Sequence, residues 1–159
     1  MNDGNNIKED FKFSKEGRLH HRSLIEGLFR KGKTFYEFPF RVIWRKLTED
    51  ELQNHFRDRI PEGIGKIQMM VSVPKKKRRK AVDRVLIRRR VKEAYRLNRL
   101  DLLNNIEGHQ ELRTLSFGLV YIHDANLSYK AIEESLRTLL YRLQTKVISQ
   151  SSMQEETHV

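Results

Sequence analysis

Residues 75–99 read KKKRRKAVDRVLIRRRVKEAYRLNR and hold thirteen Lys and Arg against two acids. This stretch therefore carries a net charge of +11, which is the formal charge of the whole 159-residue chain. The remainder is neutral in sum, with nineteen bases and nineteen acids. A neutral domain with one concentrated cationic segment is typical of a protein that binds polyphosphate, so nucleic acid is the first expected partner.

The same stretch predicts the centre of the fold. Its first six residues are all Lys or Arg and predict a loop. Asp83 is a candidate N-cap for a helix from Arg84 to about Leu103. Strand patterns flank this helix at residues 66–74 and 115–122, the second apolar enough to be central. A helix between two strands is typical of a crossover that makes those strands parallel.

Upstream, a helix is predicted over Arg22–Lys31, where apolar residues recur at helical spacing. Ser23 and Glu26 have the spacing of a capping box, and Gly32 is a candidate left-handed stop. Residues 35–47 alternate like a strand, and residues 48–65 are predicted to be a long charged connection.

The last predicted helix follows Asn126 or Ser128, either of which is a candidate N-cap. Its apolar stripe comprises Ile132, Leu136, Leu139, Leu140 and Leu143. The expected class is therefore α+β, with a mostly antiparallel sheet, one parallel strand pair and helices packed on the sheet.

Composition excludes several classes of protein. The chain has no Cys, so disulfides and thiolate metal sites are excluded, and its six His show no ligand spacing. No apolar run reaches the ~20 residues that span a bilayer. We expect a cytoplasmic protein with one domain over residues 16–148 and flexible polar tails over residues 1–15 and 149–159. The basic charge leaves an anionic membrane surface as a minor alternative.

The helix within the basic stretch is predicted to have one cationic face. At 100° per residue, a sector of about 100° collects Arg88, Arg89, Lys92, Arg96 and Arg99. The opposite side carries Ile87, Val91 and Ala94 toward the core. Like charges four residues apart repel by a few tenths of a kcal/mol, and counterion release on binding polyphosphate would offset that repulsion. The alternative is a basic face that is only solvated.

The acids predict no catalytic site on the protein. A metal nuclease needs clustered carboxylates, whereas Glu133 and Glu134 are adjacent and point in different directions. Asp83 and Glu93 each lie among bases, where a carboxylate supports a helix end or an Arg. The sequence also shows no nucleophile spaced to a base and no Gly-rich phosphate loop. We therefore assign no catalytic residue and no metal ligand.

Several segments resemble the bacterial ribonuclease P protein subunit. They are VSVPKK at residues 71–76, KAVDR at residues 80–84 and IRRRVKEAYR at residues 87–96, with looser likeness at Arg18-Leu19 and at LFRKG, residues 28–32. The resemblance implies a ribosomal S5 domain 2-like fold whose parallel strands are joined by a left-handed crossover. It also implies the small subunit of a ribonucleoprotein, in which the RNA subunit removes the 5′ leader of precursor tRNA with Mg²⁺ held mainly by RNA.

The resemblance implies two binding surfaces. One would bind the RNase P RNA through Lys75, Lys76, Lys77, Arg78, Arg79, Lys80, Arg84, Val85, Arg88, Arg89, Lys92 and Arg96. The other is a leader-binding cleft between the first helix and the sheet, with Ile25, Phe29, Arg41, Ile43, Ser72, Pro74 and Lys76. The implied partners are the RNase P RNA and precursor tRNA, and neither a membrane nor DNA is expected.

Two positions depart from the family's basic motif. Val85 stands where the family has Asn, and Leu86 where it has Arg, so an apolar group replaces an amide in the middle of the basic sector. Either the loop at residues 75–80 compensates or that interaction with RNA is absent. In the cleft, Ile25 replaces an aromatic residue and Phe29 retains one.

Two other functions fit the same charge pattern. A ribosomal-type protein would bind structured RNA without any role in processing. A helical DNA-binding protein would also present a basic helix, but no second helix directly precedes this one, as a helix-turn-helix requires.

Overall fold

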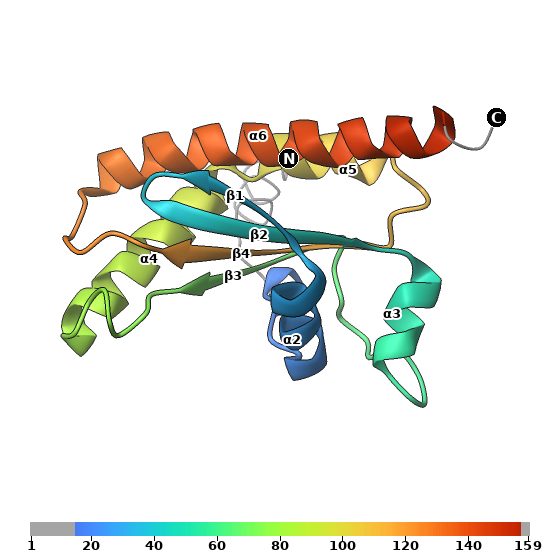
Figure 1. Cartoon of the computed structure of the whole chain (residues 1–159), viewed down its shortest axis with the longest axis horizontal. Helices are drawn as coiled ribbons and strands as arrows, with labels where there is room; N and C mark the ends of the chain where they lie inside the picture. The colour runs from blue at the N-terminus through green and yellow to red at the C-terminus, as the bar shows by residue number, and fades with distance from the viewer. Residues whose placement is uncertain (1–14, 157–159) are drawn as a thin grey trace, which may run out of the picture.

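A four-stranded sheet forms the centre of the computed structural model, which describes residues 15–156 (Figure 1). Its strands are β1 (Lys33–Glu37), β2 (Phe40–Leu47), β3 (Ile67–Ser72) and β4 (Thr114–Tyr121), in the spatial order β1-β2-β4-β3. β2 is antiparallel to β1 and β4, and β3 is parallel to β4. The predicted α+β class with one parallel pair is confirmed. Residues 1–14 and 157–159, which belong to the expected tails, lie outside the described residues.

Five α-helices surround the sheet in the described part of the chain, after a short 3-10 turn, η1 (Lys15–Gly17). They are α2 (Arg22–Lys31), α3 (Glu49–His55), α4 (Ala81–Asn98), α5 (Leu100–Glu107) and α6 (Tyr129–Glu156). Figure 1 shows α6 and α5 on one side of the sheet, and α2 and α3 on the other.

Alternation of side chains along the strands produces two cores, because successive residues point to opposite faces. The larger core joins the sheet to α4, α5 and α6, and includes Phe117, Leu119 and Tyr121 of β4. The smaller core joins the other face to α2 and α3, and includes Ile43 and Val120. All eight residues of β4 are buried, which confirms that it is a central strand.

The helix α6 confirms the apolar stripe predicted near the end of the chain. All five predicted residues are buried in the larger core. The Ser128 hydroxyl accepts a hydrogen bond from the Ala131 N–H at 3.2 Å, so Ser128 rather than Asn126 caps the helix. The helix continues through residues 149–156, where the sequence led us to expect a tail.

Residues 35–47 form a hairpin and not the single strand that was predicted. A turn at Phe38-Pro39, with a cis peptide bond, separates β1 from β2, and Glu37 pairs with Phe40 across it. Pro39 therefore lies where no ladder hydrogen bond is needed. Phe38, inside the turn, continues the apolar alternation of Phe40, Val42 and Trp44, so hydrophobic periodicity could not reveal the break.

The charged connection at residues 48–65 contains the helix α3. Its N-terminus is a capping box, in which the Thr48 hydroxyl accepts from the Glu51 N–H at 3.3 Å and the Glu51 carboxylate accepts from the Thr48 N–H at 3.4 Å. Three acids in the first turn suit the positive end of the helix dipole.

The predicted crossover helix is two helices. α4 begins at Ala81 with Lys80 at the N-cap, so Asp83 lies in the first turn and the prediction that it caps the helix is wrong. α4 ends at Asn98, and α5 begins directly after Arg99. The pair completes the crossover from β3 to β4.

The helix α2 has the predicted bounds but not the predicted ends. His21 is its N-cap without a side-chain hydrogen bond, so the capping box of Ser23 and Glu26 is wrong. Gly32 has φ −70° and ψ 155°, which is extended and not left-handed. A Cβ atom at Gly32 would collide with the Leu28 carbonyl oxygen and lie 2.7 Å from Cγ2 of Ile43, so the end of α2 itself and its packing on β2 both require glycine here.

Candidate nucleic-acid interface

The helix α4 turns its apolar side to the core and its cationic side outward, as predicted. Ile87, Val91 and Ala94 are fully buried in the larger core. Their burial fixes the rotation of the helix about its axis, which leaves Arg89 and Lys92 exposed and Arg88 half-buried.

Three cations on this face are without a partner inside the described part of the chain. Arg88, Arg89 and Lys92 make no side-chain hydrogen bond or ion pair with residues 15–156. Arg96 differs, because its guanidinium donates to the Glu93 carboxylate at 2.7 and 3.1 Å. That hydrogen bond lowers the pKa of Glu93. Of these four cations, three are therefore left for an external anion and one is neutralised internally.

The loop before α4 is held by its own arginines. Arg78 donates to the Asp83 carboxylate at 3.0 Å and also to the Asp124 carbonyl oxygen. Asn126 donates to the other oxygen of Asp83 at 2.9 Å. Asp83 therefore connects the loop to the segment that follows β4.

Arg84 closes the loop from the helix side. Its guanidinium donates to the carbonyl oxygens of Arg78 and Arg79 at 3.0 and 2.8 Å. The remaining basic residues of the loop are exposed, namely Lys75, Lys76, Lys77, Arg79 and Lys80. Of the twelve residues assigned to this surface, Arg78 and Arg84 thus shape the loop, while the five exposed cations extend the charge of α4.

Val85 and Leu86 are both exposed on the first half of α4 (37% each). The structure therefore brings two apolar side chains to the surface beside Arg88 and Arg89. They break the continuity of charge between the loop and the middle of the helix.

The second set of predicted residues lies on the opposite face of the sheet, beside α2. Arg41 on β2 pairs with Val120 on β4, which pairs with Ser72 on β3, so Arg41 and Ser72 lie on one row across the sheet. Both are half-buried, as is Pro74, and Lys76 beyond them is exposed. This part of the set is brought together between α2 and the basic loop.

The α2 side of this face is more closed. Ile43 is only 3% exposed, because it belongs to the smaller core with Leu28. Ile25 is half-buried against the same core, whereas Phe29 is 44% exposed. Ile43 therefore supports the floor of this face, and Phe29 is the aromatic of the set that is available to a ligand.

A cavity of about 690 Å³ lies at the other end of the sheet, where β4 begins. Its basic lining residues are Lys31, Lys33, Arg45, Lys46 and His109, and its acidic ones are Glu51 and Glu111. Burial lowers the pKa of Lys46, and Lys33 lowers it further. Sequence reasoning missed this cluster because its cations come from separate segments that no local pattern connects.

Within residues 15–156, no group of three or more His, Asp or Glu is close enough to hold a metal ion. None of the helices described is both long and apolar enough to cross a membrane.

The chain matches the family model described as Ribonuclease P over residues 13–144. It is 31% identical over 145 residues to the ribonuclease P protein component of two strains of Porphyromonas gingivalis, covering 91% of this chain and 96% of each relative. It is also similar to a solved Staphylococcus aureus RNase P protein, a mutant with defective mRNA degradation activity, with a TM-score of 0.56. That likeness has 17% identity over 82% of this chain and 90% of the other, and it supports the fold alone.

Proposed function

The chain belongs to the ribonuclease P protein family, and we propose that, as the protein subunit of that tRNA-processing endoribonuclease, it binds the catalytic RNA through α4 and the loop before it. The single observation that carries this proposal is that Arg88, Arg89 and Lys92 have no partner within the described residues. They lie on one helix face, repel one another and make no side-chain bond within the described residues. Phosphate binding would relieve that repulsion and release counterions.

The preorganised loop supports the same surface. Arg78, Asp83 and Arg84 hold the loop backbone through hydrogen bonds, so its exposed cations are ordered before RNA arrives. Ordering in advance lowers the entropy lost on binding. This is how the loop compensates for Val85 and Leu86 on the helix.

The 5′ leader of precursor tRNA is proposed to lie on the sheet face beside α2. Phe29 supplies a ring for base stacking, and Arg41 and Lys76 supply charge for phosphates. Ser72 and Pro74 form the surface between them, while Ile25 and Ile43 support it from below. Residues 16–148 would then act as a single RNA-binding domain.

The chemistry is proposed to belong to the RNA. Mg²⁺ takes several oxygen ligands in octahedral geometry. The acids beside the cationic surface do not fit such a site, because Asp83 is bound by Arg78 and Asn126, and Glu93 by Arg96. We infer that the RNA holds the metal, and that the protein binds, orients and screens charge without a catalytic residue of its own.

The test measures leader removal by the cognate RNA across a Mg²⁺ titration, with and without the purified protein. We expect the protein to lower the Mg²⁺ concentration needed, and the double variant Arg88→Ala/Arg89→Ala to lose much of this effect. Each phosphate that the variant no longer neutralises should reduce the salt slope of RNA binding by about one unit. Arg57→Ala, an exposed cation between α3 and β3, is the control.

Two results would count against this function. If the wild-type protein does not stimulate its matching RNA at moderate salt, the processing role is excluded. If it binds structured RNA equally well whatever the leader length, the chain acts as a ribosomal-type binding protein instead.

A further inference from the structure

Tyr36 is an exposed aromatic on the edge strand β1. It is 61% exposed, and its side chain makes no hydrogen bond or ring contact with any described residue. The neighbouring Phe38 is also exposed, but its ring packs edge-on against His123 with centroids 4.9 Å apart. Of these two exposed rings, Tyr36 is therefore the one without an aromatic partner.

The sheet register places Tyr36 on the same row as the proposed leader surface. Tyr36 pairs with Arg41, Arg41 with Val120, and Val120 with Ser72. Val120 belongs to the smaller core beneath α2, so the row lies on the α2 face. Neighbouring strands are ~4.8 Å apart, so the row runs about 14 Å from β3 to β1.

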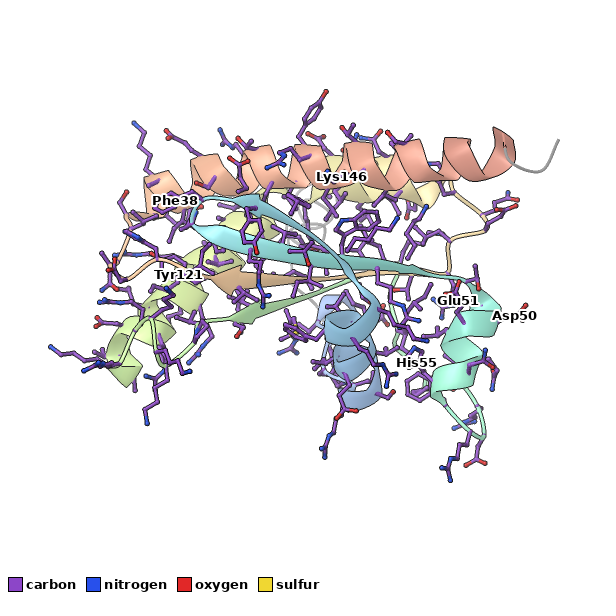
Figure 2. All side chains as sticks on the ribbon, in the orientation of Figure 1. Phe38, Asp50, Glu51, His55, Tyr121 and Lys146 are labelled. Carbon is purple, nitrogen blue, oxygen red and sulfur yellow. The ribbon has the colours of Figure 1, made fainter. Side chains whose placement is uncertain are left out.

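The basic loop lies at the β3 end of this row. Lys75 and Lys76 follow Ser72 after two intervening residues, and Tyr36 marks the β1 end. Figure 2 shows Phe38 at the tip of the β1–β2 hairpin and Tyr121 at the end of β4, at the same end of the molecule. Cations at one end and an unpartnered ring at the other suit a single strand of nucleic acid laid across the sheet.

Tyr36 and Arg41 are cross-strand neighbours whose side chains form no hydrogen bond with each other. Arg41 also makes no side-chain hydrogen bond or ion pair with the described residues. A ring and a guanidinium side by side both stack on nucleobases, and the guanidinium also contacts phosphate.

The backbone that carries Tyr36 is held in place. Arg142 of α6 donates to the Tyr36 carbonyl at 2.6 Å and to the Glu37 carboxylate at 2.8 Å. The same guanidinium lies 4.7 Å from the Phe35 ring centroid, and Lys146 lies 5.3 Å from it. The edge strand is thereby tied to α6, and a base that stacks on Tyr36 need not first order the hairpin.

We propose that Tyr36, assisted by Arg41, stacks on a base of single-stranded RNA and forms the β1 end of the leader path. The path runs from Lys75 and Lys76 across β3, β4 and β2 to β1. This inference rests on the proposed function, since it assigns Tyr36 to the same leader. Tyr36 thus supplies an aromatic ring from β1, whereas on α2 Ile25 replaces the aromatic residue that the family has there.

The test measures the affinity of the assembled ribonucleoprotein for precursor tRNA across a stepwise series of leader lengths. Tyr36→Ala should weaken binding of long leaders about fivefold or more and leave leaderless tRNA unaffected, because stacking is worth ~1–3 kcal/mol per base. Tyr36→Phe keeps the ring and should bind like the wild type. Tyr141→Ala removes a 70% exposed tyrosine on α6 and is the matched control.

A direct readout uses a fluorescent base analogue placed along a long leader. Its fluorescence should be quenched at one position of the leader in the wild type and in Tyr36→Phe. In Tyr36→Ala the quenching at that position should be lost. If Tyr36→Ala matches Tyr141→Ala at every leader length, the assignment of Tyr36 is wrong while the proposed leader surface stands. If the wild type gains no affinity from the leader, the proposed leader surface itself fails.

Discussion

At the scale of single residues, the arginines of the basic segment differ in their hydrogen-bond partners. Arg84 binds carbonyl oxygens of the loop, Arg78 binds the Asp83 carboxylate and the Asp124 carbonyl oxygen, and Arg96 is paired with Glu93. Arg88 and Arg89, of the same residue type, have no such partner in the described chain. Charge alone therefore does not separate the cations that hold the loop from those that are left for a ligand, whereas their hydrogen bonds do.

Asp83 tests this distinction because it shapes the loop through Arg78 and Asn126. Asp83→Ala should lower the free energy of unfolding by about 1.5–3 kcal/mol, the usual contribution of hydrogen bonds to charged groups. It should also weaken RNA binding, although it makes the chain more positive. Chemical unfolding and a binding titration measure the two effects. Tighter binding by the variant would show that net charge, and not loop order, governs affinity.

At the scale of elements, three segments meet where α3 docks on the sheet. Arg45 of β2 and His55 of α3 lie 3.1 Å apart, between Nη1 and Nε2. A Cβ atom at Gly27 of α2 would lie 2.7 Å from that Arg45 nitrogen, so glycine allows α2 to approach the pair. Burial lowers the pKa of His55, as do Arg45, Lys31 and Arg30, while Glu51 raises it. A neutral His55 can accept the hydrogen bond from Arg45.

This junction predicts that acid weakens the fold. The folded-state pKa of His55 lies below its ordinary value of 6.5, so the unfolded chain takes up the proton first. Stability is therefore full above pH 6.5 and is lost as the pH falls from there through the folded-state pKa. His21, whose pKa burial also lowers, contributes to the same slope. Chemical unfolding at a series of pH values should show a smaller loss for His55→Gln than for the wild type. An equal loss would mean that His55 is not the group responsible.

At the scale of the whole molecule, the sheet separates two cationic regions. The exposed loop at residues 75–80 follows the end of β3, and the cavity with Lys31 and Lys33 lies where β4 begins. Only the first adjoins the unpartnered cations of α4. The two regions thus allow the effect of position to be separated from the effect of total charge.

Two double variants with the same change in charge make the comparison. Lys76→Ala/Lys77→Ala should lower the association rate and reduce the salt slope of RNA binding by up to about two units, because each phosphate that is no longer neutralised removes about one. Lys31→Ala/Lys33→Ala should leave the slope near that of the wild type. Stopped-flow binding over a range of salt concentrations provides both values. Equal effects in the two variants would show that the protein attracts RNA through its total charge.

Local patterns were sufficient to predict the order of the main elements. The bounds of α2, the two faces of α4 and the apolar stripe of α6 follow from residues three or four apart on one helix. The break at Phe38-Pro39 was missed because Phe38 continues the apolar alternation of β2 into the turn. The break at Arg99 was also missed, and the helix α3 was missed because its residues are mostly polar.

The sequence by itself determined that the chain concentrates its charge on one helix and its preceding loop, since both are continuous in the chain. Only the tertiary structure decided which cations are already hydrogen-bonded within the protein. Arg78, for example, donates to the Asp124 carbonyl oxygen, and the two residues lie on either side of the whole crossover. The tertiary structure alone brought Tyr36, Arg41 and Ser72 into one row, since strand register joins residues that no local spacing relates.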